Sequence, residues 1–413
     1  MPKADTPPGF KPLRDTALFT PFKLGPLNLE HRIVQAPLTR MRSTKESDGV
    51  TVPNDLNVEY YGQRANKGGL QLTEATDICK YAGGYPGAPG IFTESQIAGW
   101  KRVTDAVHAK GGYIFCQLWF TGRASPPSFR GGQQPVSSSD IPMTGNWADG
   151  TPCADHPPRP MTIEEINQTV KDWGIAAKNA IAAGFDGIEI HGANGYLIDQ
   201  FLHDNVNKRT DEYGGSVENR CRLPLEVIQE TSKAIGPDRV GIRLSPYNYF
   251  QDTKDSNPNE HWEYLCEKIA TLPEDVRPAY VHMVEPRFDE VLDEKAKMDA
   301  LSAYTNSSHG VEAEATIKPK TNNLVNFRNI LRKGGVKFIA AGGFTRDNAL
   351  PKVESSDADL IIFGRWFIAN PDLPKRLAEG LRLNQYDRST FYGADPPSKG
   401  YVDYPFFEQD VAA

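Results

Sequence analysis

The stretch Phe185-Asp186-Gly187-Ile188-Glu189-Ile190-His191 is a short apolar run that ends in a chemically useful side chain. Further runs of the same kind occur along the chain at residues 33–37, 70–74, 113–119, 240–244, 280–285, 337–342 and 358–364. They lack strong polar alternation, which is typical of strands that are buried on both faces. The sequence therefore predicts eight buried parallel strands.

Helical patterns separate these runs. Gln96–Lys110 places apolar residues on one face, and Thr162-Ile163-Glu164-Glu165 is typical of a capping box at a helix start. We expect Ser216 to cap a helix that continues to about Ile235. Further helices are expected at 58–65, 262–271, 322–332, 346–353 and 374–381. Eight strand–helix repeats predict an α/β fold of the (β/α)8 barrel (TIM barrel) type. A doubly wound sheet is the rival, but no G-x-G-x-x-G follows a strand.

The excess length lies in three connections, 125–160, 247–261 and 288–320, which follow the third, fifth and sixth predicted strands. They are thus expected as long loops on the C-terminal face, where barrels build active sites. The segment 22–29 is expected to form an N-terminal hairpin that closes the bottom of the barrel. We expect one domain over residues 1–413, with a core of about 18–407.

Composition excludes several classes of protein. The 413 residues carry a net charge of −7 and are 39% hydrophobic, which argues against intrinsic disorder and against binding nucleic acid or an anionic membrane. Five scattered cysteines without a C-x-x-C pair favour a reducing compartment. No apolar signal segment or membrane-spanning run occurs, so we expect a cytoplasmic protein. The eight histidines have no metal-ligand spacing, and no metal site is expected.

The ends of the predicted strands carry the chemistry. Gly342-Gly343 and Gly364-Arg365 follow strands seven and eight, where barrels commonly hold a phosphate group, although the glycine pair could equally form only a tight turn. His191-Gly192-Ala193-Asn194-Gly195-Tyr196 follows strand four. His191 and Asn194 could donate to one carbonyl oxygen and Tyr196 could act as a general acid. Each residue alone is more often structural, but the trio favours function.

Arg243 is the third feature, because a strand-end arginine inside a barrel needs an acceptor or an anion as partner. A neighbouring carboxylate, such as Glu74 or Glu189, is one candidate. A cofactor that becomes anionic is the other.

The chain resembles the old yellow enzyme family of flavin-dependent ene-reductases found in fungi, plants and bacteria. The resemblance covers about Leu18 to Phe407. It is carried in order by the runs Ala36-Pro37-Leu38-Thr39-Arg40-Met41-Arg42, Gln117-Leu118-Trp119, the run from His191 to Leu197, Asn207–Ser216, Arg243-Leu244-Ser245-Pro246 and Gly364–Pro371.

This resemblance implies bound FMN and reduction by NADPH or NADH. It further implies that the flavin ring is contacted by Pro37, Thr39, Ala75, Gln117 and Arg243, and that its phosphate is held by Gly343, Gly364 and Arg365. His191 and Asn194 would bind the carbonyl oxygen of an enone, Tyr196 would donate the proton, and Trp119 and Tyr392 would shape the substrate pocket. The chain departs from the family pattern at Phe120, where a histidine is common, and at Ala75, where many members have glycine. We expect a monomer or a homodimer that acts on a small-molecule enone.

Three alternatives remain at this point. A member of the family could isomerise or dehydrogenate its substrate in a secondary-metabolite pathway, although a proton donor favours reduction. A barrel glycosidase could use two of the carboxylates Glu74, Glu189 and Glu285, but would leave Thr39, Gln117 and Arg243 without a role. A non-catalytic binding protein would be expected to lack the trio that ends in Tyr196.

Overall fold

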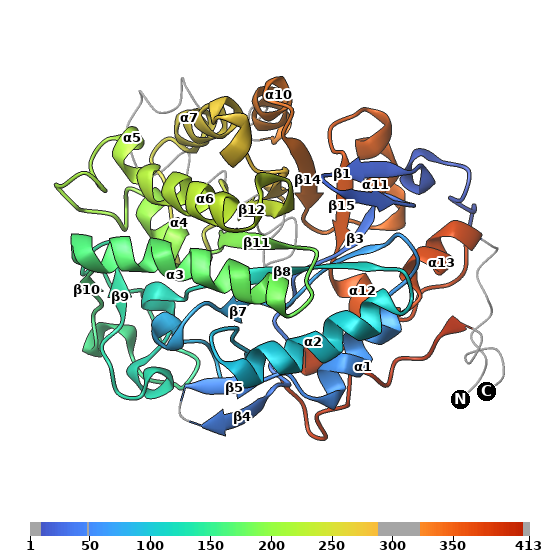
Figure 1. Cartoon of the computed structure of the whole chain (residues 1–413), viewed down its shortest axis with the longest axis horizontal. Coiled ribbons are helices and arrows are strands. Elements are labelled where there is room, and N and C mark those ends of the chain that lie inside the picture. Colours follow the sequence, from blue (N-terminus) through green and yellow to red (C-terminus); the bar gives the residue numbers. More distant parts are fainter. Residues whose placement is uncertain (1–9, 48, 288–322, 408–413) are drawn as a thin grey trace.

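The computed structural model describes residues 10–47, 49–287 and 323–407. The predicted connection 288–320 lies outside the described residues. All eight predicted strands are present, in one sheet (Figure 1). They are β3 (Ile33–Gln35), β6 (Leu70–Leu72), β8 (Tyr113–Trp119), β11 (Gly187–Gly192), β12 (Val240–Leu244), β13 (Tyr280–Val284), β14 (Lys337–Ala341) and β15 (Leu360–Phe363).

The sheet is a closed parallel barrel. Each strand pairs in parallel with the next along the chain, and β15 returns to pair with β3. Closure removes the exposed edges that an open sheet would leave. The short strand β7 (Thr76–Asp77) adds to the end of β8. The (β/α)8 prediction is therefore confirmed.

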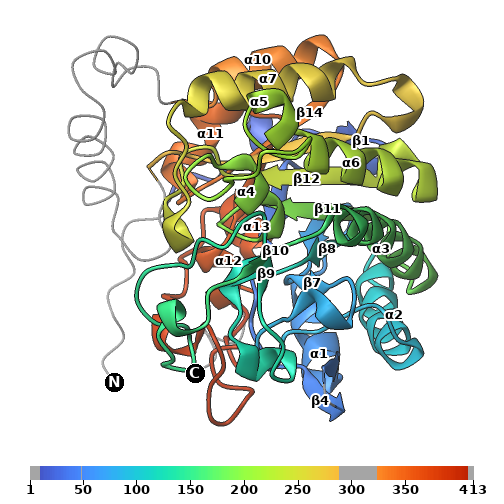
Figure 2. The same cartoon turned by 90° about the vertical axis from the view of Figure 1, so that its left-hand side faces the viewer.

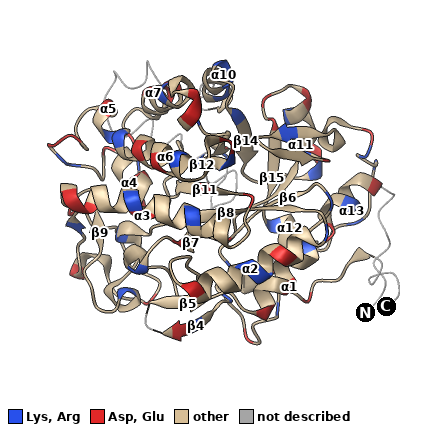
Figure 3. Cartoon of the chain, in the orientation of Figure 1, with Lys and Arg blue, Asp and Glu red and all other residues tan. Residues whose placement is uncertain are grey.

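Helices follow the strands on the outside of the barrel (Figure 2). Within the described ranges the helices are α1 (Asp55–Arg64), α2 (Glu94–His108), α3 (Ile163–Ala182), α4 (Leu197–Leu202), α5 (Val217–Arg220), α6 (Arg222–Ile235), α7 (Pro258–Thr271), α10 (Val325–Lys333), α11 (Arg346–Glu354), α12 (Arg365–Ala369) and α13 (Leu373–Glu379). Lys and Arg are interspersed with Asp and Glu along α2 and α3 (Figure 3).

The helix starts follow local capping chemistry. The hydroxyl of Thr162 accepts from the backbone N–H of Glu165, and the carboxylate of Glu165 accepts from the N–H of Thr162. Ser216 caps α5 as expected, but the helix expected to run to Ile235 is divided at Cys221. Pro224 explains the division, because it has no N–H to donate to the carbonyl of Arg220.

Apolar side chains form one cluster on the outer face of the barrel sheet and another on its inner face. The outward side chains of the strands, such as Ile190 and Ile242, pack with the helices in the larger cluster. Inward side chains near the strand starts form the second cluster with the hairpin β1 (Phe22–Leu24) and β2 (Leu27–Leu29). This hairpin closes the bottom of the barrel, as predicted.

The long connection 125–160 is tied together by a short parallel pair, β9 (Val136–Ser137) and β10 (Arg159–Pro160). A second hairpin, β4 (Thr44–Ser47) and β5 (Val50–Val52), precedes α1. In the part of the chain that the structure describes, no helix is both long and apolar enough to cross a membrane.

Candidate active site

The predicted site residues gather at the carboxyl ends of neighbouring strands. Glu189 on β11 is paired with Gln117 on β8, and His191 on β11 is paired with Arg243 on β12. Side chains two residues apart on one strand share a face. Gln117, His191 and Arg243 therefore lie on the inner face of three adjacent strands at the same end of the barrel.

A buried carboxylate organises the barrel interior beneath this end. Glu189 accepts hydrogen bonds from Gln117 Nε2 at 2.8 Å, from Tyr280 Oη at 3.1 Å and from His282 Nδ1 at 3.0 Å. The contact fixes the amide of Gln117, because its nitrogen faces Glu189. The carboxylate is thus used to position the polar residues around it.

His191 is a neutral hydrogen-bond donor in this setting. Burial, the charge of Arg243 and the neighbouring His282 lower the pKa of His191 well below its ordinary value. Its Nδ1 accepts from the backbone N–H of Ala193 at 3.4 Å. The neutral ring therefore carries its proton on Nε2.

The loop after β11 has a strained backbone at Asn194, and it brings Tyr196 beside His191. Asn194 and Gly195 have φ angles of 57° and 75°, in the left-handed region. A Cβ on Gly195 would lie 2.8 Å from the carbonyl oxygen of Phe250, so glycine is required there. The N–H of Asn194 donates to Ser245 Oγ at 2.8 Å and holds the loop against the strand end.

Tyr196 packs edge-on against two aromatic rings of the site. Its ring centroid lies 4.9 Å from that of Trp119 and 4.9 Å from that of His191, at interplanar angles of 88° and 84°. Burial of the phenol, reinforced by Tyr85 and Tyr392, raises the pKa of Tyr196 well above 10. The phenol is thus kept in its proton-donating form.

The remaining residues expected around a ring system come from the other half of the barrel. Pro37 and Ala75 are buried, and Thr39 is partly exposed; they follow the paired strands β3 and β6. Trp119 is fully buried at the end of β8. Tyr392 is 68% exposed, yet it contributes to the raised pKa of Tyr196, so it lies at the rim of the site.

The predicted phosphate-binding residues lie at the ends of β14 and β15, which pair with each other. Gly343 is exposed and has a φ of 61°, a conformation that favours glycine. Gly364 is the N-cap of α12, and Arg365 is its first residue. Exposed backbone and a guanidinium are the groups that bind phosphate in proteins.

The carboxylates of the glycosidase alternative are held by other side chains. Glu74 accepts from Asn57 Nδ2 at 3.2 Å and from the N–H of Arg40, and burial raises its pKa to about 7. Glu285 pairs with Lys352 at 3.0 Å. Within the described residues, no group of three or more His, Cys, Asp and Glu side chains could hold a metal ion.

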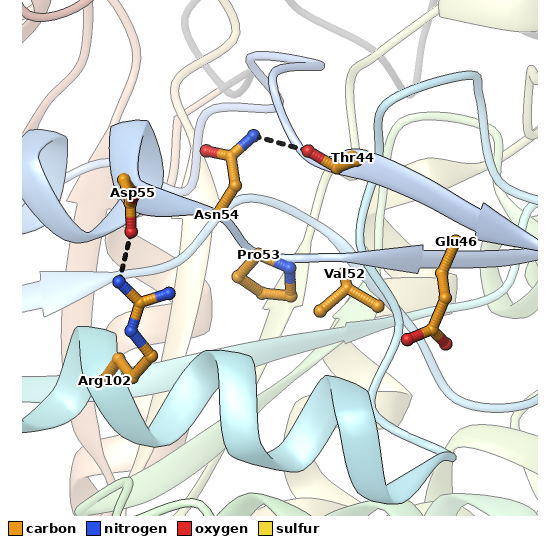
Figure 4. Close-up of a pocket in the computed structure, with 7 residues that line it drawn as sticks. All are labelled: Thr44, Glu46, Val52, Pro53, Asn54, Asp55 and Arg102. Atoms are coloured by element: carbon orange, nitrogen blue, oxygen red, sulfur yellow. Dashed lines mark hydrogen bonds and ion pairs between the residues drawn. The ribbon is translucent and has the colours of Figure 1, made fainter.

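A surface pocket of about 340 Å³ lies between the β4–β5 hairpin, the start of α1 and the helix α2 (Figure 4). It is bordered by Thr44 and Glu46 on the β4–β5 hairpin and by Arg102 on α2. None of the predicted site residues contributes to it.

The model of the NADH:flavin oxidoreductase / NADH oxidase family, whose cofactor is FMN, matches residues 17–384. The chain belongs to this family. Among curated relatives, the flavin oxidoreductase hxnT of Emericella nidulans is 63% identical over 389 residues, which are 94% of this chain and 97% of hxnT.

Solved structures of the family agree in fold. Morphinone reductase in complex with tetrahydroNAD superposes with a TM-score of 0.79 at 39% identity, covering 95% of this chain and 98% of that one. The old yellow enzyme homologue of Zymomonas mobilis gives a TM-score of 0.79 at 36% identity, covering 94% and 99%. The chain is thus an FMN-dependent oxidoreductase of the old yellow enzyme family, as the sequence motifs indicated.

The residues present are compatible with the cofactor of the family. Arg243 supplies a cation on the inner face of the barrel, and Gln117 supplies an amide whose orientation Glu189 fixes. Gly343 lies at the adjoining strand ends, where a phosphate group would be bound. An amide, a cation and exposed glycine backbone are groups that can bind a pyrimidine edge, an anionic reduced ring and a phosphate, so the residues present fit FMN.

Proposed function

We propose that this enzyme reduces the activated C=C bond of α,β-unsaturated carbonyl compounds with NADPH or NADH as reductant. The observation that carries the proposal is the grouping of a neutral histidine, an asparagine and a protonated tyrosine at the end of β11. A glycosidase would instead need two available carboxylates.

His191 and Asn194 would hold the carbonyl oxygen of the substrate. Both present N–H groups, and neither carries a charge, so they can stabilise negative charge that develops on this oxygen. Hydrogen bonding draws electron density from the β-carbon and makes it a better hydride acceptor. The hydride would be supplied by FMN when it is bound and has been reduced by the nicotinamide cofactor.

Tyr196 would deliver the proton to the α-carbon. Its raised pKa keeps the phenol protonated, and its edge-on contacts with Trp119 and His191 fix the ring beside the carbonyl-binding pair. One hydride and one proton added across the C=C bond complete the reduction. Trp119 and Tyr392 would shape the substrate pocket.

The FMN would be held through both halves of the barrel. Pro37, Thr39 and Ala75 at the ends of β3 and β6, with Gln117 and Arg243, would contact the ring. Gly343, Gly364 and Arg365 would bind the phosphate. We further propose that residues 18–407 act as one domain.

An anaerobic experiment tests the proposal. The purified protein is reduced with NADPH, mixed with 2-cyclohexenone, and followed by flavin absorbance. Bleaching by NADPH and recovery on the enone are the expected results. A flavin that NADPH bleaches but that neither this enone nor a panel of open-chain enones reoxidises would contradict ene-reductase activity.

A further inference from the structure

Asn248 lies in the loop after β12 and is buried, with 5% of its surface exposed. Its Nδ2 donates to Asn194 Oδ1 at 3.0 Å, and its Oδ1 accepts from the backbone N–H of Phe250 at 3.1 Å. We propose that Asn248 is a positioning residue that makes Asn194 a hydrogen-bond donor, and so sets the preference of the site for substrates with an acceptor oxygen. The inference deepens the proposed function and rests on it for the role of Asn194.

The direction of each hydrogen bond is fixed by a backbone group. A backbone N–H can only donate, so the oxygen of the Asn248 amide must face Phe250. Its nitrogen must then face Asn194, and only the oxygen of Asn194 can accept from it. The amide nitrogen of Asn194 is consequently turned away from Asn248, ready to donate to a ligand.

The backbone of Asn194 is fixed in the same manner. Its N–H donates to Ser245 Oγ at 2.8 Å, and Ser245 Oγ donates to Asp199 Oδ2 at 3.4 Å. The N–H of Gly195 donates to the same carboxylate oxygen at 2.8 Å. With the backbone held by Asp199, the orientation of the Asn194 side chain depends on its contact with Asn248. Within the described residues, that side chain has no other hydrogen bond.

Asn248→Asp is the informative substitution, because it keeps the shape of the side chain but replaces the group that donates to Asn194 with one that accepts. One carboxylate oxygen would still accept from Phe250, and the other could only accept from Asn194. The Asn194 amide would then rotate and present its oxygen to the ligand. Asn248→Ala removes the constraint without imposing the opposite orientation.

The experiment compares two unreactive ligands, cyclohexanone and cyclohexanol, by their perturbation of the absorbance of the oxidised flavin. The ketone can only accept, whereas the alcohol can also donate. We expect Asn248→Asp to lower the preference for the ketone over the alcohol about 10- to 100-fold. Asn248→Ala should give a smaller loss, of about 2- to 10-fold. Dithionite-reduced Asn248→Asp should also be reoxidised by 2-cyclohexenone with a raised half-saturation concentration.

An unchanged ketone-to-alcohol ratio in either variant overturns the proposal. The proposal is also overturned if the affinities for the ketone and the alcohol fall by the same factor while the flavin content stays full, because a purely structural role would weaken binding of both ligands alike. If Asn248→Asp does not fold, the ratio in Asn248→Ala decides. The ratio is measured without turnover, so it tests the positioning role of Asn248 independently of catalysis. Failure of the native enzyme to reduce enones would contradict only the proposed function.

Discussion

Tyr196 is held in its acid form by its surroundings, since burial and two neighbouring tyrosines raise the pKa of its phenol. Replacing it with phenylalanine removes the proton and keeps the ring contacts with Trp119 and His191. We expect Tyr196→Phe to slow reoxidation by an enone about 10²- to 10⁴-fold, the usual contribution of a general acid. Flavin content and reduction by NADPH should be unchanged.

Stopped-flow measurement of the two half-reactions checks this expectation. Enone reoxidation at the native rate, shown to be rate-limiting at saturating NADPH, would remove Tyr196 from the role of proton donor. Tyr213→Phe serves as the matched control. This substitution removes a hydroxyl that donates a hydrogen bond to Glu226 at 2.9 Å. Tyr213 is not one of the predicted site residues.

The pH dependence of the same step follows from two residues. His191 has its pKa lowered from 6.5, so it becomes charged only at more acidic pH. Tyr196 has its pKa raised above 10, so it loses its proton only at more alkaline pH. Both active forms, neutral His191 and protonated Tyr196, therefore persist between these limits.

We expect the rate of enone reoxidation to be level from about pH 6.5 to about pH 9. It should fall only outside this range. The measurement is the rate of reoxidation of dithionite-reduced enzyme across a series of buffers. A titration centred near pH 6.5 that persists in Tyr196→Phe would mean that His191 exchanges a proton at its ordinary pKa.

At the scale of elements, the ends of the paired strands β14 and β15 are the predicted binding site for the phosphate group of FMN. Arg365 begins α12 directly after Gly364. If its guanidinium binds the phosphate, Arg365→Ala should weaken binding of FMN about 10- to 100-fold and leave binding of riboflavin unchanged, since riboflavin has no phosphate. Titration of the apoprotein with both flavins gives the two affinities. An equal loss for FMN and riboflavin would place the role of Arg365 in folding.

The strands could be predicted from the sequence because burial on both faces leaves short apolar runs, most of which have a polar residue or glycine at or near their carboxyl end. The candidate site residues at those ends, such as His191 and Arg243, can be named from the sequence for the same reason, because they follow from the position of the strands. The division of the helix at Cys221 was missed, although Pro224 was a readable signal for it. Asn248 could not be singled out from the sequence, because its role depends on a contact with Asn194, which lies in a different loop 54 residues earlier.

At the scale of the whole molecule, the cofactor would connect elements that are far apart in the chain. The predicted contacts lie on β8 and β12 or directly follow β3, β6, β14 and β15, and these strands span most of the barrel. A ligand that binds only the folded state stabilises it by about 2.7 kcal/mol when its free concentration is 100 times its Kd. Excess FMN should therefore raise the free energy of unfolding of the apoprotein by about that amount.

Urea unfolding followed by far-ultraviolet circular dichroism and by tyrosine and tryptophan fluorescence measures this effect. Closure of the sheet between β15 and β3 makes the first and last strands neighbours, so opening one pair exposes the shared core. We therefore expect both signals to change in one coincident transition, which FMN moves to higher urea. Two separate transitions, of which FMN shifts only one, would contradict the single domain over residues 18–407. In that case the flavin would stabilise only part of the barrel.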